Sequence, residues 1–429
     1  MKEFIRKIVV FLLTLEAKAV LKKYKPKIIV VTGSVGKTST KDATYAALKH
    51  HAFVRKSEKS FNSDIGVPLT ILGLPNGWGN GVQWVRNLID GFLLTLVTTP
   101  YPQWVVVEVG ADRPGDISKS LAWLEPDVVV TTRFPDVPVH VEFYTSPEEV
   151  VCEELHPISQ LATNGVAVVN TEDEHAMSAD VPKGRKRLTY GFSKDADVKA
   201  SHYRVLTKKN MPNGISFVVS YKTQQIRLSL YGIIGQTHVY AVLGGVAGAL
   251  AAGASLENME RFAESFNPPP GRMRLIEGAK GSMLIDDSYN ASPIATAEAL
   301  RALHSAPATR RIAVLADMFE LGRFSAEEHR RIGDLAKECA DVVVAVGVRA
   351  RSIVERLEEL GASKQSIHVF ERGSDAADYL FKEIQKGDVI LIKGSQGMRM
   401  ERAVKVLMAN PTNAEQLLAR QDPEWLGRP

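Results

Sequence analysis

The sequence is poor in cysteine: its 429 residues include only Cys152 and Cys339. Two cysteines exclude a disulfide scaffold and a cysteine-rich metal site, and they fit the reducing cytoplasm. An excess of charge of one sign is also lacking, because the formal net charge is only +4. This balance gives no indication of a nucleic-acid partner. The basic runs at 22–27 and 183–187 are interpreted as solvated surface, although either could meet an anionic partner.

Long hydrophobic runs are absent as well. The apolar run near the N-terminus, IVVFLL at 8–13, is too short to span a bilayer, and no convincing signal-peptide cleavage site follows it. Residues 1–26 are therefore predicted to form an amphipathic helix packed on the body, with a membrane-surface anchor as the alternative. The segment 84–100 leaves the same alternatives open, and Asp90 and Gly91 argue against a spanning helix there. Its apolar residues at helical spacing are Trp84, Leu88, Ile89, Phe92 and Leu96.

The composition that is present, 45% hydrophobic and 24% charged, is ordinary for a globular protein. Strand-like runs alternate with helical patterns, which predicts an α/β fold with mostly parallel sheets covered by helices. Residues 186–232 are expected to form antiparallel strands around MPNG at 211–214, and a small-residue helix is expected at 232–253. The Pro-rich segment 266–272 is the clearest linker. After it the alternation restarts, so a second α/β unit is predicted.

The stretch VVTGSVGKTST at 30–40 has the order strand, glycine-rich turn, Gly-Lys-Thr and helix. Its glycines permit positive φ and a close approach of the backbone, so loop N–H groups and the helix N-terminus can hold phosphate oxygens. Lys37 is expected on the outer phosphates and the Thr38 hydroxyl on Mg²⁺. An ordinary strand-to-helix turn is the less favoured alternative. The predicted nucleotide-binding residues of the loop are Gly33, Ser34, Val35, Gly36, Lys37, Thr38 and Ser39.

Polar residues follow other predicted strands. Glu108 ends one strand and His140 follows another, and such positions face the ligand crevice of α/β folds. With the loop they are predicted to bind a metal, although a surface or structural role is the alternative for either residue alone. The adjacent Asp286 and Asp287 end a later strand and suggest ribose or metal contact. The turn within 393–401 opens a helix whose N-terminus suits a carboxylate or phosphate.

Seven stretches together resemble the Mur ligases: TGSVGKTSTKD, SDIGVPLTILG, VEVGADRPGDI, PPPGRMRL, LIDDSYNASP, LADMFELG and LIKGSQGMRMERAV. They extend from residue 32 to about 407. LIDDSYNASP and FELG are typical of the MurF branch, which adds D-alanyl-D-alanine to a UDP-muramoyl peptide. After the helix predicted at 1–26, the resemblance implies a central P-loop ATPase domain at 27–268 and a Rossmann-like ligase domain at 269–429. It also implies that ATP phosphorylates a substrate carboxylate and that an amine then attacks the acyl phosphate.

The resemblance also implies roles for individual residues. The catalytic set is Lys37, Glu108, His140, Glu154 and Arg272. The metal ligands are Thr38, Glu108 and His140. Arg272, Asp287 and Asn290 join the loop in binding the nucleotide, with Asp287 on the ribose. Asn62 is placed near the substrate peptide, and Ser395 and Glu401 near the incoming amine.

Three departures from the family pattern bear on function. Only about 27 residues precede the loop strand, where the family normally has a domain that grips uridine diphosphate. The position of the family's carbamylated lysine falls on Glu154, which supplies a carboxylate directly but on a shorter arm; a solvated helix residue is the alternative. Near the adenine, the family's His-Asn and Asn are replaced by Thr237, His238 and Ala241.

The sequence therefore predicts a cytoplasmic, monomeric, ADP-forming amide ligase that uses ATP and Mg²⁺. Its expected substrates are small molecules, a muramoyl peptide and D-alanyl-D-alanine or another amine, with peripheral membrane contact possible and no nucleic acid. Two alternatives stay open. One is a ligase of the same superfamily with another donor and amine, such as a polyglutamate or a lipid-linked muropeptide. The other is a non-catalytic nucleotide-binding relative.

Overall fold

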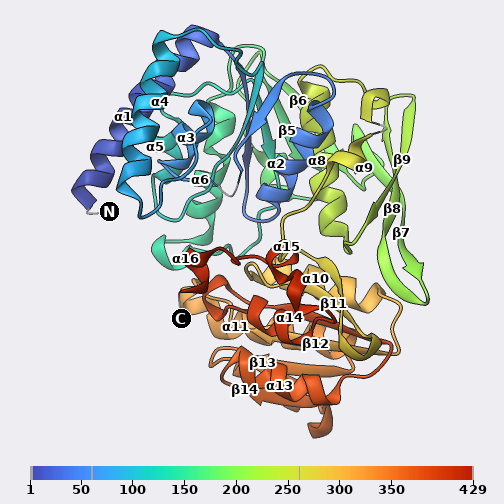
Figure 1. The fold of residues 1–429 in the computed structure, drawn as a ribbon. Helices are drawn as coiled ribbons and strands as arrows, with labels where there is room; N and C mark the ends of the chain where they lie inside the picture. The colour runs from blue at the N-terminus through green and yellow to red at the C-terminus, as the bar shows by residue number, and fades with distance from the viewer. Residues whose placement is uncertain (1–2, 59–60, 260, 428–429) are drawn as a thin grey trace.

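The computed structural model describes residues 3–58, 61–259 and 261–427, which form two α/β units, one above the other in Figure 1. The first unit contains a nine-stranded sheet in the order β2-β3-β1-β4-β5-β6-β7-β8-β9. Its strands are β1 (Lys27–Thr32), β2 (Val54–Lys56), β3 (Trp104–Glu108), β4 (Val128–Thr131), β5 (Val166–Asn170), β6 (Lys186–Gly191), β7 (Val198–Lys208), β8 (Met211–Tyr221) and β9 (Gln224–Tyr231). Its longer helices are α1 (Glu3–Tyr24), α2 (Lys37–Leu48), α4 (Gly81–Leu96), α6 (Pro147–Ser159) and α8 (Gln236–Ala251), and its shorter ones are α3 (Gly66–Leu72), α5 (Asp116–Leu121), α7 (Glu174–Ser178) and α9 (Phe262–Ser265).

Alternation along the strands divides the apolar core of the first unit into two layers. In β1, Ile29 and Val31 pack on one face with α2 and α8, whereas Ile28 and Val30 pack on the other with α1, α3, α5 and α6. Successive side chains of a strand point to opposite faces, so a buried strand is apolar throughout. The parallel strands therefore carry the continuous apolar runs from which they were predicted.

The antiparallel part of the sheet begins later than predicted. Strand β6 pairs in parallel with both β5 and β7, and only β7, β8 and β9 are antiparallel to one another. MPNG lies inside β8 and is not the turn. The reversal falls on Lys209 and Asn210, both with positive φ (51° and 62°), because a tight hairpin needs left-handed residues at its centre.

The second unit contains a six-stranded sheet in the order β10-β11-β15-β12-β13-β14, in which only β10 is antiparallel. The strands are β10 (Arg274–Glu277), β11 (Met283–Asp287), β12 (Arg310–Ala316), β13 (Val342–Val346), β14 (Ile367–Phe370) and β15 (Asp388–Lys393). The helices are α10 (Pro293–Ser305), α11 (Ser325–Cys339), α12 (Arg351–Glu359), α13 (Gly373–Glu383), α14 (Glu401–Leu407), α15 (Ala414–Leu417) and α16 (Pro423–Leu426). Asp287 and Lys393, the last residues of β11 and β15, line one pocket with residues of the first unit, so the carboxyl ends of these strands face that unit. The alternation of strands and helices in both units confirms the predicted α/β class.

Helix α1 packs on the first unit through Val9, Leu13, Ala17 and Val20, as the amphipathic prediction requires. Helix α4 buries Trp84, Asn87 and Gly91 and exposes Ile89, Phe92 and Leu96 of the apolar residues noted at helical spacing. Within the described ranges, no helix is both long enough and apolar enough to cross a bilayer.

Candidate active site

The glycine-rich loop connects the end of β1 to the start of α2. Gly33 has φ of 118°, and a Cβ atom there would lie 2.3 Å from Thr132 Oγ1, so only glycine fits. Gly36 caps α2 at its N-terminus with φ of 91°. The loop therefore has the geometry that the sequence predicted, with the N-terminus of a 12-residue helix at its end.

Two of the loop N–H groups are engaged by the protein itself. Ser34 and Val35 donate to the Arg133 carbonyl oxygen at 3.0 and 3.2 Å, which joins the loop to the segment after β4. The expectation that these two N–H groups hold phosphate is therefore revised. Phosphate oxygens are better matched to the N-terminus of α2, where the helix dipole also favours an anion.

Glu154 lies beside the loop and is not a solvated helix residue. Its side chain is buried on α6, accepts a hydrogen bond from Ser34 Oγ at 2.5 Å, and lies 3.4 Å from Lys37 Nζ. Lys37 also donates to the Gly33 carbonyl oxygen. A carboxylate therefore stands next to the loop lysine, and its replacement of the family's carbamylated lysine stays a prediction.

Thr38 and Glu108 provide oxygen ligands suited to a divalent cation. Thr38 Oγ1 donates to Glu108 Oε1 at 3.1 Å, and Glu108 is buried. Glu108 Oε2 lies 3.6 Å from Lys41 Nζ and accepts no hydrogen bond from the described residues. Mg²⁺ is commonly held by one or two protein oxygens together with phosphates and water, so this pair fits it. Lys41 is fully buried and was missed by sequence reasoning, although it stands one helical turn after Lys37.

His140 lies in the same region but contacts acids from other elements. Its Nδ1 is 2.8 Å from Glu320 Oε2 and its Nε2 is 3.5 Å from Asp112 Oδ1. The contact with His140 lowers the pKa of Glu320 below its ordinary value. In the described part of the chain, no three His, Cys, Asp or Glu side chains are grouped closely enough to hold a metal alone. A metal role for His140 thus remains a prediction.

The two units enclose a cavity of about 820 Å³, named here the interdomain cavity. The first unit contributes Lys37, Thr38, Asn62, Glu108 and His140. The junction and second unit contribute Arg272, Asn290, Ser395 and Arg399, with Trp425 near the C-terminus. Most of the predicted catalytic and substrate residues therefore face one space, although they lie far apart in sequence.

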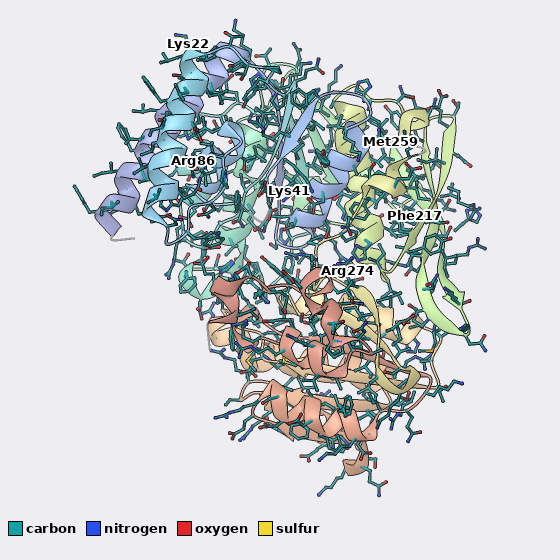
Figure 2. The ribbon with its side chains drawn as sticks, viewed as in Figure 1. Lys22, Lys41, Arg86, Phe217, Met259 and Arg274 are labelled. Carbon is teal, nitrogen blue, oxygen red and sulfur yellow. The ribbon has the colours of Figure 1, made fainter. Side chains whose placement is uncertain are left out.

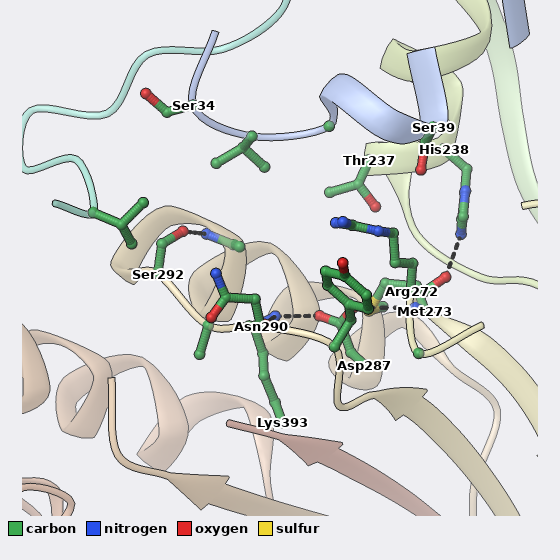
Figure 3. A pocket seen from close by; sticks show the side chains of 17 residues that line it. Ser34, Ser39, Thr237, His238, Arg272, Met273, Asp287, Asn290, Ser292 and Lys393 are labelled. Carbon is green, nitrogen blue, oxygen red and sulfur yellow. Dashed lines mark hydrogen bonds and ion pairs between the residues drawn. The ribbon is translucent and has the colours of Figure 1, made fainter. Parts of the chain in front are cut away.

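A second, narrower pocket of about 110 Å³ adjoins the loop (Figure 3). Arg272 reaches from the junction to Thr38 Oγ1 at 3.4 Å, and its guanidinium lies 4.3 Å from the centre of the Tyr289 ring. Burial lowers the pKa of His238 to about 4, so its neutral ring donates through Nε2 to the Arg272 carbonyl oxygen at 3.1 Å. Thr237 Oγ1 is buried and has no hydrogen-bond partner among the described residues, which suits it to a ligand in this pocket.

Asp287 faces this pocket, but its carboxylate is already held. Lys393 forms an ion pair with Oδ2, and the Met273 N–H donates to Oδ1 at 3.1 Å (Figure 3). Carboxylate oxygens retain further lone pairs for a ligand, and the ribose contact of Asp287 stays a prediction. Asp286 is not a pocket residue: it is fully buried and bonds to Ser288, and burial raises its pKa to about 6.

The predicted amine-binding residues divide into two groups. Ser395 lines the interdomain cavity, and its Oγ accepts from the Phe319 N–H at 2.8 Å. Glu401 is only 1% exposed and does not line the cavity; it accepts from Arg399 Nε at 2.6 Å and lies 3.4 Å from Arg420. Arg399, the partner of Glu401, lines the cavity itself and was missed by sequence reasoning. The sequence could have indicated Arg399, because it lies in the same turn as Ser395, which was predicted to bind the amine.

Comparison with known protein families gives two adjacent matches. Residues 31–82 and 91–249 match the Mur ligase middle domain, and residues 271–396 match the Mur ligase, glutamate ligase domain. The chain belongs to the Mur ligase family. The two matches fall on the two α/β units, and the loop, Arg272, Asp287 and Ser395 lie within them.

Among individual Mur ligases, this chain is similar to UDP-N-acetylmuramoyl-tripeptide--D-alanyl-D-alanine ligases. It is 30% identical to that of Mycobacterium tuberculosis (H37Rv) over 90% of this chain and 73% of the relative. It is 27% identical to that of Escherichia coli K12 over 90% and 78%. The fold matches a MurF ligase of Thermotoga maritima in complex with ADP, with a TM-score of 0.74, 24% identity and coverage of 95% and 84%.

Proposed function

We propose that this Mur ligase joins D-alanyl-D-alanine to a muramoyl peptide in the cytoplasm, with hydrolysis of ATP to ADP and phosphate. The observation that supports this best is the interdomain cavity, in which the loop and Glu108 face Arg272, Ser395 and Arg399. A carboxylate is a poor acylating agent, and phosphorylation converts it into a good one. Positioning and charge neutralisation then supply most of the catalysis.

Individual roles follow from where the charges lie. Lys37 and Arg272 bring two cations to the phosphates. Mg²⁺, when held by Thr38 and Glu108, would supply further neutralisation of phosphate charge. The N-terminus of α2 supplies backbone donors and a positive dipole. Arg399 and Ser395, at the opposite wall, are suited to orient the carboxylate of the incoming dipeptide, and Glu401 fixes the Arg399 guanidinium.

A different donor is the second candidate. Arg6 of α1 pairs with Asp64 at 2.5 Å, two residues after Asn62, which lines the interdomain cavity, so α1 is joined to the segment that we assign to the donor. A ligase of the same family could accept a lipid-linked muropeptide there. A panel of donors separates the two candidates.

The test is product formation by the purified protein with ATP, Mg²⁺, muramoyl tripeptide and D-alanyl-D-alanine. We expect ADP release that requires both substrates, and a product whose mass contains both. Lys37→Ala should abolish this, whereas Lys49→Ala, an exposed lysine directly after the same helix, should not. Two results would contradict the proposal. One is ADP release at the same rate with and without donor and amine, and the other is no ADP release with any donor–amine pair of the panel.

A further inference from the structure

The outer surface of α1 and α4, named here the α1–α4 face, is unusually apolar. Of the 21 exposed large apolar side chains in the described residues, 13 lie on these helices or at Val97, which follows α4. They include Phe4 (74% exposed), Phe11 (62%), Phe92 (55%) and Leu96 (63%). A monomer rarely exposes so many apolar residues together, and such a patch marks an interaction surface.

Helix α4 is apolar on both sides: Trp84, Leu88 and Leu94 pack on the first unit, and a second apolar stripe faces outward. Its inner side carries Asn87, which donates to the Pro75 carbonyl at 2.7 Å and accepts from Gln83 at 2.8 Å. Gly91 on the same side packs against Glu16 of α1. Because the inner side already packs α4 on the protein, the outward apolar stripe is not needed for the core and is available to another partner.

The two helices form one fixed platform, side by side in Figure 1. Lys23 of α1 donates to the carbonyl oxygens of Leu94, Thr95 and Val97, at 3.2, 3.1 and 2.8 Å, and so caps the end of α4. Tyr24 stacks on Tyr101 with ring centres 4.6 Å apart. A preformed platform loses little conformational entropy when it docks.

Charge identifies the partner. The first 27 residues carry eight basic and two acidic side chains, although the whole chain has a net charge of only +4. Lys18, Lys22 and Lys25 are exposed around the apolar stripe, and Figure 2 places Lys22 at the end of α1 near the top of the molecule. Burial raises the pKa of Glu16 to about 7, which weakens its negative charge near neutral pH. A second copy would bring these cations together, whereas an anionic bilayer attracts them.

We propose that the α1–α4 face docks on an anionic lipid bilayer. Apolar side chains would enter the boundary between headgroups and acyl chains, and the flanking lysines would contact acidic headgroups. The Arg6–Asp64 pair connects this platform to the loop of Asn62, so docking brings the donor side of the interdomain cavity toward the membrane. This placement does not depend on the ligase activity proposed above.

The test is flotation of the purified protein with vesicles of equal parts phosphatidylglycerol and phosphatidylcholine, compared with phosphatidylcholine alone. We expect binding to the anionic vesicles that weakens with salt. Phe11→Ser with Phe92→Ser should weaken it about tenfold or more. The matched control is Tyr231→Ser with Val348→Ser, two equally exposed apolar residues elsewhere, which should bind as the wild type does.

Charge is tested separately with Lys18→Glu and Lys22→Glu together, against Lys364→Glu and Lys405→Glu in the second unit. Only the first pair should reduce binding. Circular dichroism of each variant verifies folding. Absent flotation of the wild type, or equal flotation of the Phe11/Phe92 variant, overturns the proposal. A dimer that this variant abolishes, without vesicle binding, would assign the face to a second copy and also overturn it.

Discussion

At the scale of residues, the site depends on a few buried charges whose neighbours come from distant parts of the chain. Glu154 of α6, Glu108 of β3 and Arg272 of the junction all meet at the loop. Their residue types were predictable from the family pattern. Their partners were not predicted: the pairing of Lys41 with Glu108 depends on the packing of α2 against β3, and the pairing of Lys393 with Asp287 depends on the order of strands in the second sheet.

Glu154 provides a test of the replaced carbamate. A carbamylated lysine makes activity depend on bicarbonate, whereas glutamate is ionised at neutral pH without it. We expect the turnover of the wild type to be the same with and without added bicarbonate. Glu154→Gln should lower turnover about 10- to 100-fold, as for other groups that support a metal site, and Glu154→Lys should be inactive or rescued by bicarbonate.

Glu148→Gln is the matched control, since Glu148 lies on the same helix and is exposed. Steady-state turnover with and without bicarbonate is the measurement. Full activity of Glu154→Gln would show that the contacts of Glu154 with Ser34 and Lys37 have no part in the reaction.

His238 should make stability depend on pH. Its folded pKa of about 4 lies below its ordinary value of 6.5 because the ring is buried. As pH falls from 7 to 5 the unfolded state gains protons that the folded state does not, so the protein loses stability. Urea unfolding should show that the stability of wild type relative to His238→Gln falls by about 2 kcal/mol between pH 7 and pH 5. If the stability difference between wild type and His238→Gln is the same at both pH values, the ring takes up a proton as readily in the folded protein as in the unfolded one.

At the scale of elements, α2 is held in place by α8. A Cβ atom on Gly245 of α8 would lie 2.5 Å from Ala43 Cβ and 2.6 Å from Thr44 N, so glycine permits this close contact. Because α2 begins at the loop, the packing of α8 fixes the direction in which the helix N-terminus points.

Gly245→Ala should therefore separate α2 from α8. We expect a loss of about 1–3 kcal/mol in the free energy of unfolding, together with weaker ATP binding. Gly81→Ala, where an added Cβ meets no atom within 4 Å, is the control and should change neither. Calorimetry of ATP binding beside denaturant unfolding is the measurement, and wild-type values for Gly245→Ala would contradict the packing argument.

The type of each longer element, helix or strand, was predictable from the sequence. Which side of a helix faces the protein was predictable only in part. The continuous apolar strands of both sheets were identified because burial on two sides leaves a plain pattern. Short strands β2 and β10 were missed, since three or four residues carry little periodicity. The side on which the apolar stripe of α4 lies stayed open, because periodicity reports amphipathicity without stating which side meets water.

At the scale of the whole molecule, the two units meet through specific contacts. Arg133 of the first unit lies 3.3 Å from Glu298 of the second, and His140 contacts Glu320. His140 and Glu320 line the interdomain cavity. The chain passes from one sheet to the other through 266–273, and we predict that this segment is a hinge.

We expect ligands to favour the closed arrangement, because Arg272 and Asn290 complete a site that begins on the loop. X-ray scattering should give a smaller radius of gyration with an ATP analogue and donor than without them. Arg133→Ala with Glu298→Ala should enlarge the ligand-free form. Identical profiles with and without ligands, once binding is established independently, would count against closure.

The central claim is that ATP activates a carboxylate inside the interdomain cavity. The most direct measurement uses a donor with heavy oxygen at both positions of its carboxylate, followed by mass analysis of the released phosphate. If an acyl phosphate forms and the amine displaces its phosphate, one heavy oxygen must move from the donor to each phosphate released. Phosphate without the label, formed at the rate of the amide product, would contradict the account.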